Sequence, residues 1–296
     1  MLCNCYLKHV LKVPMRQLFK RMLCEEGTIQ LSPEKYIGYR KRAGRIDKPG
    51  VLFCSGFLSN LNGTKAVFLD EYCQRNDISC VRFDYVGHQF SSGTMNDFSI
   101  REWKQNALEV LDRVTEGPQI VVGSSMGAWI SFLVALERGE RVHSVLSISN
   151  AADILIPRWE LANIRTVAML GFYWCRLKLQ GLLGFEETGK DDVSDEGHSQ
   201  QHRVPTGAPP LSAIFSARDD SIFSQETIDI RCPVRLLHAR NDSVVPYTNS
   251  VRIGECLVSD DVQIEIVEDA DHRFSSPENL EMLSQVLDEL LTKRCS

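Results

Sequence analysis

The sequence predicts an α/β fold: a mostly parallel central sheet, helices on both of its faces, and a cap inserted between two parts of the chain. Short apolar runs alternate with helical patterns up to residue 148 and again after residue 233, and this alternation is typical of parallel sheets. Between one such strand and one such helix stands G-S-S-M-G at 123–127. Strand, sharp turn and helix are the context in which a G-x-S-x-G serine acts as a nucleophile.

In the first part of the chain, strands and helices follow one another in regular order. We expect strands at 28–31, 35–40, 51–54, 79–83 and 120–122, and helices at 64–74, from Ser99 to Val114 and at 126–136. Ser32 and Pro33 separate the first two strands, which we expect to pair antiparallel at the edge of the sheet. Ser99 is expected to cap its helix through its hydroxyl oxygen.

The alternation continues with a strand at 142–148 and is then interrupted. After the interruption we expect strands at 234–237 and 262–267 and helices at 248–256 and from Ser276. We read residues 28–296 as one domain that carries a cap and a mobile loop at about 150–224. The aromatic part of this insertion contains Trp159, Phe172 and Trp174, which are candidate substrate contacts; core packing is an equally good explanation of them.

Composition excludes several classes of function. The formal net charge of −6 argues against nucleic acid as a partner, and no apolar run approaches the length of a membrane span. The ten cysteines include no C-x-x-C pair, which fits free thiols in a reducing compartment. The histidines show no ligand spacing, so we expect neither a metal ion nor another cofactor.

The N-terminal segment, residues 1–27, is basic, and no acidic residue occurs before Glu25. Such segments resemble mitochondrial transit peptides. On this ground we expect a mitochondrial location. The alternative is a basic helix or a disordered tail, which would leave the protein in the cytoplasm.

A serine nucleophile needs a histidine base and a carboxylate that orients the base. When the serine lies on a strand-to-helix turn, the three residues follow in the order serine, acid, histidine. Asp242 follows the strand at 234–237, and His272 follows the strand at 262–267. We therefore predict that Ser125, Asp242 and His272 form a catalytic triad.

Several segments resemble α/β-hydrolases, and more closely the mitochondrial abhydrolases that act as palmitoyl-protein thioesterases and acyl-glucuronide esterases. The resembling segments are 55–59, 62–66, 82–85, 117–127, 151–153, 232–238, Asp242 with Val245 and Pro246, and 271–273. The sequence departs from this group in the cap and at 87–89, where Gly-His-Gln replaces the usual G-x-G.

The resemblance implies a serine esterase or thioesterase that works through an acyl-enzyme, on an acylated small molecule or an S-acylated protein. It places the nucleophile, acid and base on Ser125, Asp242 and His272, and the backbone amides of Phe57 and Met126 are the expected oxyanion hole. The alternatives are a small-ester carboxylesterase, a peptidase, and a hydrolase-fold binding protein without catalytic activity.

Overall fold

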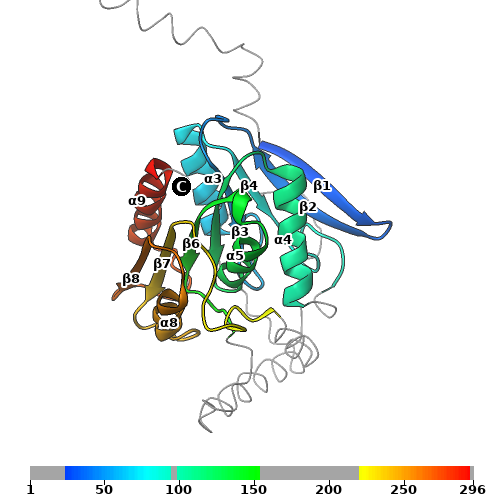
Figure 1. Ribbon diagram of the computed structural model, residues 1–296. Coiled ribbons are helices and arrows are strands. Elements are labelled where there is room, and N and C mark those ends of the chain that lie inside the picture. The colour runs from blue at the N-terminus through cyan, green and yellow to red at the C-terminus, as the bar shows by residue number, and fades with distance from the viewer. Residues whose placement is uncertain (1–23, 95–98, 154–219, 294–296) are drawn as a thin grey trace, which may run out of the picture.

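The central sheet contains eight strands in the computed structural model, which describes residues 24–94, 99–153 and 220–293 (Figure 1). The strands are β1 (Cys24–Ser32), β2 (Lys35–Arg42), β3 (Gly50–Cys54), β4 (Cys80–Phe83), β5 (Gln119–Ser124), β6 (Val142–Ile148), β7 (Val234–Ala239) and β8 (Val262–Val267). Their spatial order is β1-β2-β4-β3-β5-β6-β7-β8. From β4 to β8 all neighbours are parallel, so the predicted fold class is confirmed.

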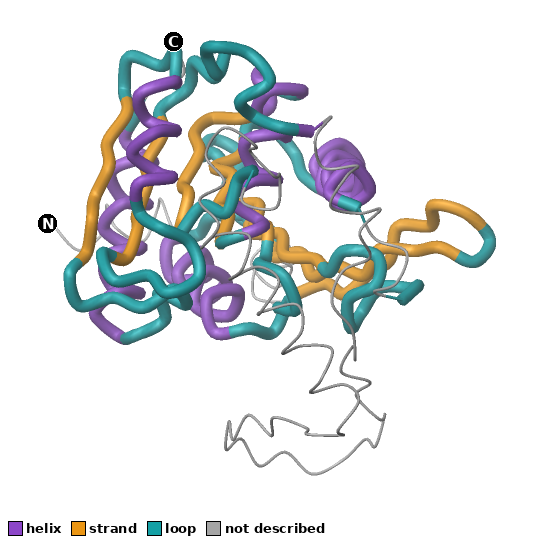
Figure 2. The backbone as a smooth tube through the Cα atoms, turned by 90° about the horizontal axis from the view of Figure 1, so that it is seen from below, coloured by secondary structure: helices purple, strands orange, loops and turns teal. Residues whose placement is uncertain are grey.

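The two antiparallel strands lie at one edge, as predicted. β1 pairs antiparallel with β2, and β2 pairs antiparallel with β4. The hairpin of β1 and β2 reaches beyond the rest of the sheet (Figure 2). β1 begins at Cys24, which lies opposite Arg42. The end of the basic segment that we expected to precede the domain is therefore part of the sheet.

The described helices are α3 (Thr64–Asn76), α4 (Ile100–Val114), α5 (Met126–Glu137), α8 (Thr248–Cys256) and α9 (Pro277–Thr292), with a short 3₁₀ helix, η2 (Gly139–Arg141). Two of these helices are capped by serines: the Ser99 hydroxyl, as predicted, accepts a bond from the Glu102 amide at 3.1 Å. The Ser276 hydroxyl does the same for the Asn279 amide at 3.3 Å. Within the described residues, no helix is both long and apolar enough to cross a membrane.

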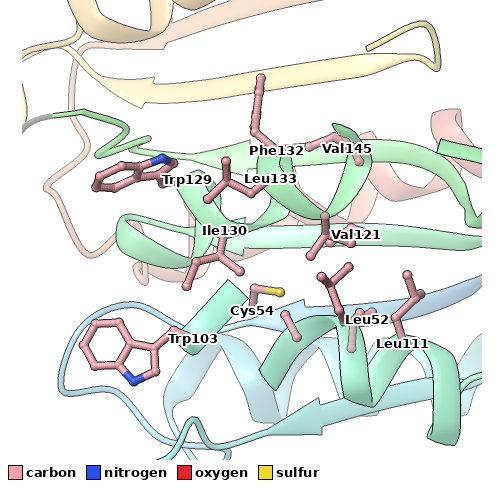
Figure 3. Packing of buried hydrophobic residues seen from close by; sticks show 14 of the residues in the cluster. Leu52, Cys54, Trp103, Leu111, Val121, Trp129, Ile130, Phe132, Leu133 and Val145 are labelled. Atoms are coloured by element: carbon pink, nitrogen blue, oxygen red, sulfur yellow. The ribbon is translucent and has the colours of Figure 1, made fainter. Parts of the chain in front are cut away.

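Each face of the sheet has its own apolar core, because successive strand side chains point to opposite faces. In β3, Leu52 and Cys54 pack in the core under α4 and α5, whereas Val51 and Phe53 pack in the core under α3 and α9. Figure 3 shows the first core, in which helix side chains such as Ile130 and Leu133 lie over Val121 of β5. This two-sided burial makes β5 a rigid support for the residue that follows it.

Two groups of predictions lie outside the described residues. One is the targeting role of most of the N-terminal segment. The other is the cap, including the candidate substrate contacts Trp159, Phe172 and Trp174.

Candidate active site

Ser125 occupies a strained turn between β5 and α5. Its backbone angles are φ 55° and ψ −116°, a combination that residues other than glycine rarely adopt and that is often found at functional sites. The turn is held in place because the Ser125 amide donates to the carbonyl of Ile148 at 2.8 Å. The hydroxyl is thereby presented at the carboxyl end of the sheet, where open α/β folds bind their ligands.

The glycines of the motif make this turn possible. A Cβ atom on Gly123 would lie 2.4 Å from the carbonyl oxygen of Gly127, a separation that no side chain tolerates. In the loop after β3, a Cβ on Gly56 would lie 3.5 Å from the Cβ of Ser125. That loop therefore lies directly against the serine, as the sequence argument required.

The predicted base and acid lie next to the serine. His272 Nε2 is 3.0 Å from Ser125 Oγ, and His272 Nδ1 is 2.7 Å from Asp242 Oδ2. Both distances are hydrogen-bond lengths. Since Asp242 can only accept, Nδ1 carries the proton and Nε2 is free to take the serine proton.

Hydrogen bonds to the carboxylate of Asp242 keep it ionised. Its side chain is fully buried, and its Oδ1 accepts from the amides of Val244 at 2.8 Å and Val245 at 2.9 Å. Burial alone would raise the pKa, but the bonds from two histidines, His238 and His272, and from these amides hold the pKa of Asp242 well below its usual range. A charged carboxylate therefore faces His272 Nδ1.

Two other acidic residues that precede members of the triad in the sequence, Asp271 and Asp220, have different partners. The carboxylate of Asp271 accepts from the Phe274 amide at 2.9 Å, within the loop that carries His272. Asp220 is buried and pairs with Lys104 Nζ at 2.9 Å. Both contacts are structural, which favours Asp242 as the acid.

A lysine at the start of α3 contacts the loop that carries His272. Lys65, in the first turn of α3, donates from Nζ to the Arg273 carbonyl and lies 3.4 Å from Ser275 Oγ. Burial lowers the pKa of Lys65 to about 8, with Asp271 opposing that effect. No local sequence pattern signals this contact, because the partners are separated by 208 positions.

The candidate oxyanion-hole residues flank the serine in the chain or in space. Met126 is the first residue of α5, and the amides at a helix start have no partner within the helix. Phe57 follows Gly56 in the loop beside Ser125, and its ring packs on Trp103 at a centroid distance of 6.0 Å. Phe57 and Leu58 expose 37% and 51% of their surface, so an apolar rim borders this part of the site.

The described residues contain no group of three or more His, Cys, Asp or Glu side chains that could hold a metal ion. The chemistry that the described residues support is nucleophilic acyl transfer by a serine, because nucleophile, base and acid are connected in one hydrogen-bonded chain.

The sequence matches known hydrolases over most of its length. A family model described as "Serine aminopeptidase, S33" matches residues 47–276. The mitochondrial palmitoyl-protein thioesterase ABHD10 of Mus musculus is 32% identical over 257 residues, covering 87% of this chain and 79% of the mouse protein. The Homo sapiens protein of the same name is 29% identical over 260 residues, covering 87% and 77%.

Solved structures agree with these matches. Alpha/beta hydrolase domain-containing protein 10 from mouse superposes with a TM-score of 0.73 at 29% identity, covering 90% of this chain and 98% of that one. A putative hydrolase from Agrobacterium vitis S4 gives a TM-score of 0.70 at 27% identity, covering 91% and 99%.

Proposed function

Because the chain belongs to the α/β-hydrolase family whose model is described as serine aminopeptidase, and is a serine hydrolase of esters or thioesters, we propose that Ser125, His272 and Asp242 carry out its reaction. The observation that supports this most directly is the hydrogen-bonded chain from Ser125 Oγ through His272 to Asp242, with distances of 3.0 and 2.7 Å. The predicted resemblance to α/β-hydrolases is confirmed by the family match.

The proposed mechanism has two acyl-transfer steps. Ser125 Oγ attacks the acyl carbonyl while His272 Nε2 takes its proton, and Asp242 stabilises the resulting imidazolium. His272 then gives the proton to the leaving thiol or alcohol, which leaves the acyl group on Ser125. Water, activated by the same histidine, releases the carboxylic acid. The amides of Phe57 and Met126 bind the oxyanion in both steps, because their positions are set before the charge develops.

For the substrate, we propose a mitochondrial acyl thioester, in the form of an S-acylated protein or an acylated small molecule. The support is the similarity to proteins named mitochondrial palmitoyl-protein thioesterases, at 29–32% identity. The exposed apolar side chains of Phe57 and Leu58 beside the nucleophile fit an acyl chain better than a charged group.

The nucleophile is tested by comparing Ser125→Ala with Ser131→Ala in the full-length protein. Ser131 lies in α5, where its hydroxyl donates to the Ala128 carbonyl at 2.7 Å, so the control removes a hydroxyl close to the site but outside the triad. The wild type and Ser131→Ala should be labelled by a fluorophosphonate probe and should hydrolyse p-nitrophenyl esters. A folded Ser125→Ala protein with wild-type turnover would refute the proposed nucleophile.

The substrate class is tested with three acyl donors: S-acyl peptides, p-nitrophenyl esters and aminoacyl anilides. We expect kcat/KM to be highest for thioesters or esters and to rise several-fold with each added methylene that the protein buries, since burying a methylene contributes about 0.8 kcal/mol. A profile that is flat or falls beyond acetyl would reject an acyl-chain substrate. Preference for the anilides would identify an aminopeptidase, the activity in the description of the family.

A further inference from the structure

A second histidine lies beside the acid of the proposed triad. His238, near the carboxyl end of β7, is fully buried. Its Nε2 lies 3.0 Å from the carbonyl oxygen of Val245 and 3.4 Å from Oδ2 of Asp242. Its Nδ1 lies 2.7 Å from the hydroxyl of Ser250 in α8.

These contacts determine where the proton of His238 resides. The carbonyl of Val245 and the ionised Asp242 can only accept hydrogen bonds. Nε2 therefore carries the proton, and Nδ1 accepts from the Ser250 hydroxyl, the one partner here that can donate. The Nε2–H of His238 consequently points toward Val245 and Asp242.

The turn that this N–H holds is the one that orients the acid. The amide of Val245 donates to Asp242 Oδ1 at 2.9 Å, and the carbonyl of the same residue accepts from His238. Val245 is thus fixed from both sides of its backbone. A loss of the His238 contact would free the turn and with it the direction in which Asp242 faces His272.

We propose that His238, with its tautomer set by Ser250, is a positioning residue that holds Asp242 in the orientation needed to support His272. The role presupposes the proposed triad and extends it by two residues, His238 and Ser250, that act through Asp242.

The test compares, in the full-length protein, two replacements of His238 whose side-chain amides differ in length. In His238→Asn the side-chain amide is too short to replace Nε2, whereas in His238→Gln the amide nitrogen reaches that position. We expect kcat per labelled active site to fall about tenfold in the asparagine variant, as in other sites that lose an orienting partner, with KM little changed. The glutamine variant should recover most of this loss.

A spectroscopic readout separates orientation from stability. The proton shared by His272 Nδ1 and Asp242 should give a far-downfield proton resonance in the wild type, which should weaken or move upfield in His238→Asn and return in His238→Gln. If His238→Asn does not fold, Ser250→Ala replaces it; this variant removes only the hydroxyl that donates to Nδ1, and the same resonance should weaken.

The matched control is His143→Asn. His143 is also buried and also contacts one serine and one carbonyl, Ser144 Oγ at 3.3 Å and the Lys293 oxygen at 3.2 Å. It lies at the amino end of β6, opposite the triad. Its substitution should lower the melting temperature but leave kcat per labelled site and the resonance unchanged.

Two results would overturn the positioning role: an asparagine variant that keeps the wild-type kcat and resonance, or equal losses in the asparagine and glutamine variants. Either result, obtained while Ser125→Ala is inactive, would leave the proposed function standing. Turnover by Ser125→Ala would instead refute the proposed function itself.

Discussion

Gly127 lies so close to Cys54 that a Cβ atom on the glycine would be 2.0 Å from the cysteine carbonyl oxygen. The first turn of α5 is therefore pressed against the end of β3. This contact brings the loop that contains Phe57 up to Ser125, so one glycine links the nucleophile to one side of the candidate oxyanion hole.

Gly127→Ala should destabilise the protein and reduce its activity, because the new methyl group collides with backbone atoms that cannot turn aside. We expect a loss of about 3 kcal/mol in the free energy of unfolding, at the upper end of the range for overpacked sites. Urea unfolding measures the stability, and fluorophosphonate labelling measures the fraction of protein that keeps a reactive serine.

Gly139→Ala is the matched control, since a Cβ there would meet no atom within 4 Å. Its free energy of unfolding should stay within about 0.5 kcal/mol of the wild type. Equal losses in the two variants would show that the close approach at Gly127 does not limit stability.

Asp242→Asn should lower kcat by about 10⁴, because an asparagine can present its NH₂ group to His272 Nδ1 and reverse the required tautomer. Asp271→Asn should cost far less activity, since the carboxylate of Asp271 accepts from the Phe274 amide within the loop. Steady-state kinetics of both folded variants decide between the two acids. A larger loss in Asp271→Asn would make Asp271 the catalytic acid.

Much of this site could be predicted because its parts are local in sequence. The apolar run before Ser125 and the small residues around it define the strand, turn and helix within a dozen positions. Asp242 and His272 each follow an apolar strand, and parallel strands place their carboxyl ends at the same edge of a sheet. The bounds of most elements were predicted for the same reason.

The remaining features depend on contacts that no local pattern encodes. The start of β1 was missed because its first residues, Cys24 to Gly27, are largely polar and exposed and show no alternation. The role of His238 depends on Ser250, which α8 brings to it across twelve positions. A histidine four residues before the acid was the one available signal, and histidines at strand ends are common in other roles.

Lys65→Met should loosen the loop that carries His272, because the donor to the Arg273 carbonyl is lost while an unbranched side chain of similar length is kept. One hydrogen bond from a charged donor contributes about 1.5–3 kcal/mol. We therefore expect kcat/KM to fall about tenfold. The measurement is ester hydrolysis per labelled site.

Lys41→Met provides the comparison. Lys41 Nζ pairs with Glu116 at 3.0 Å on the surface, with 77% of the glutamate side chain exposed, so its removal should leave turnover unchanged. If Lys65→Met also keeps its turnover, the lysine does not support the histidine loop.

Asp84 joins two loops at the active-site end of the sheet. It is fully buried after β4, and its two carboxylate oxygens accept from the amides of Leu61 at 2.7 Å and Phe90 at 3.0 Å. Burial raises the pKa of Asp84 to about 6, although these two amides oppose the rise. The folded protein therefore holds this proton more tightly than the unfolded chain, whose value is 3.8.

The stability that Asp84 contributes should consequently depend on pH in a defined direction. A group whose pKa is raised on folding stabilises the protein fully below the unfolded value, and that contribution is lost as the pH rises through the folded value. Asp84→Asn does not titrate, so the wild type should exceed the variant in free energy of unfolding by more at pH 4.5 than at pH 7.5. The change in that difference between these two pH values should be about 2 kcal/mol, because one pKa unit corresponds to about 1.4 kcal/mol and pH 4.5 is already above the unfolded value. Urea unfolding of both proteins across this pH range measures the difference in free energy of unfolding. The contributions of all other titrating groups cancel in that difference. A difference that stays constant, or grows as the pH rises, would mean that Asp84 is not the proton-binding group between the two loops.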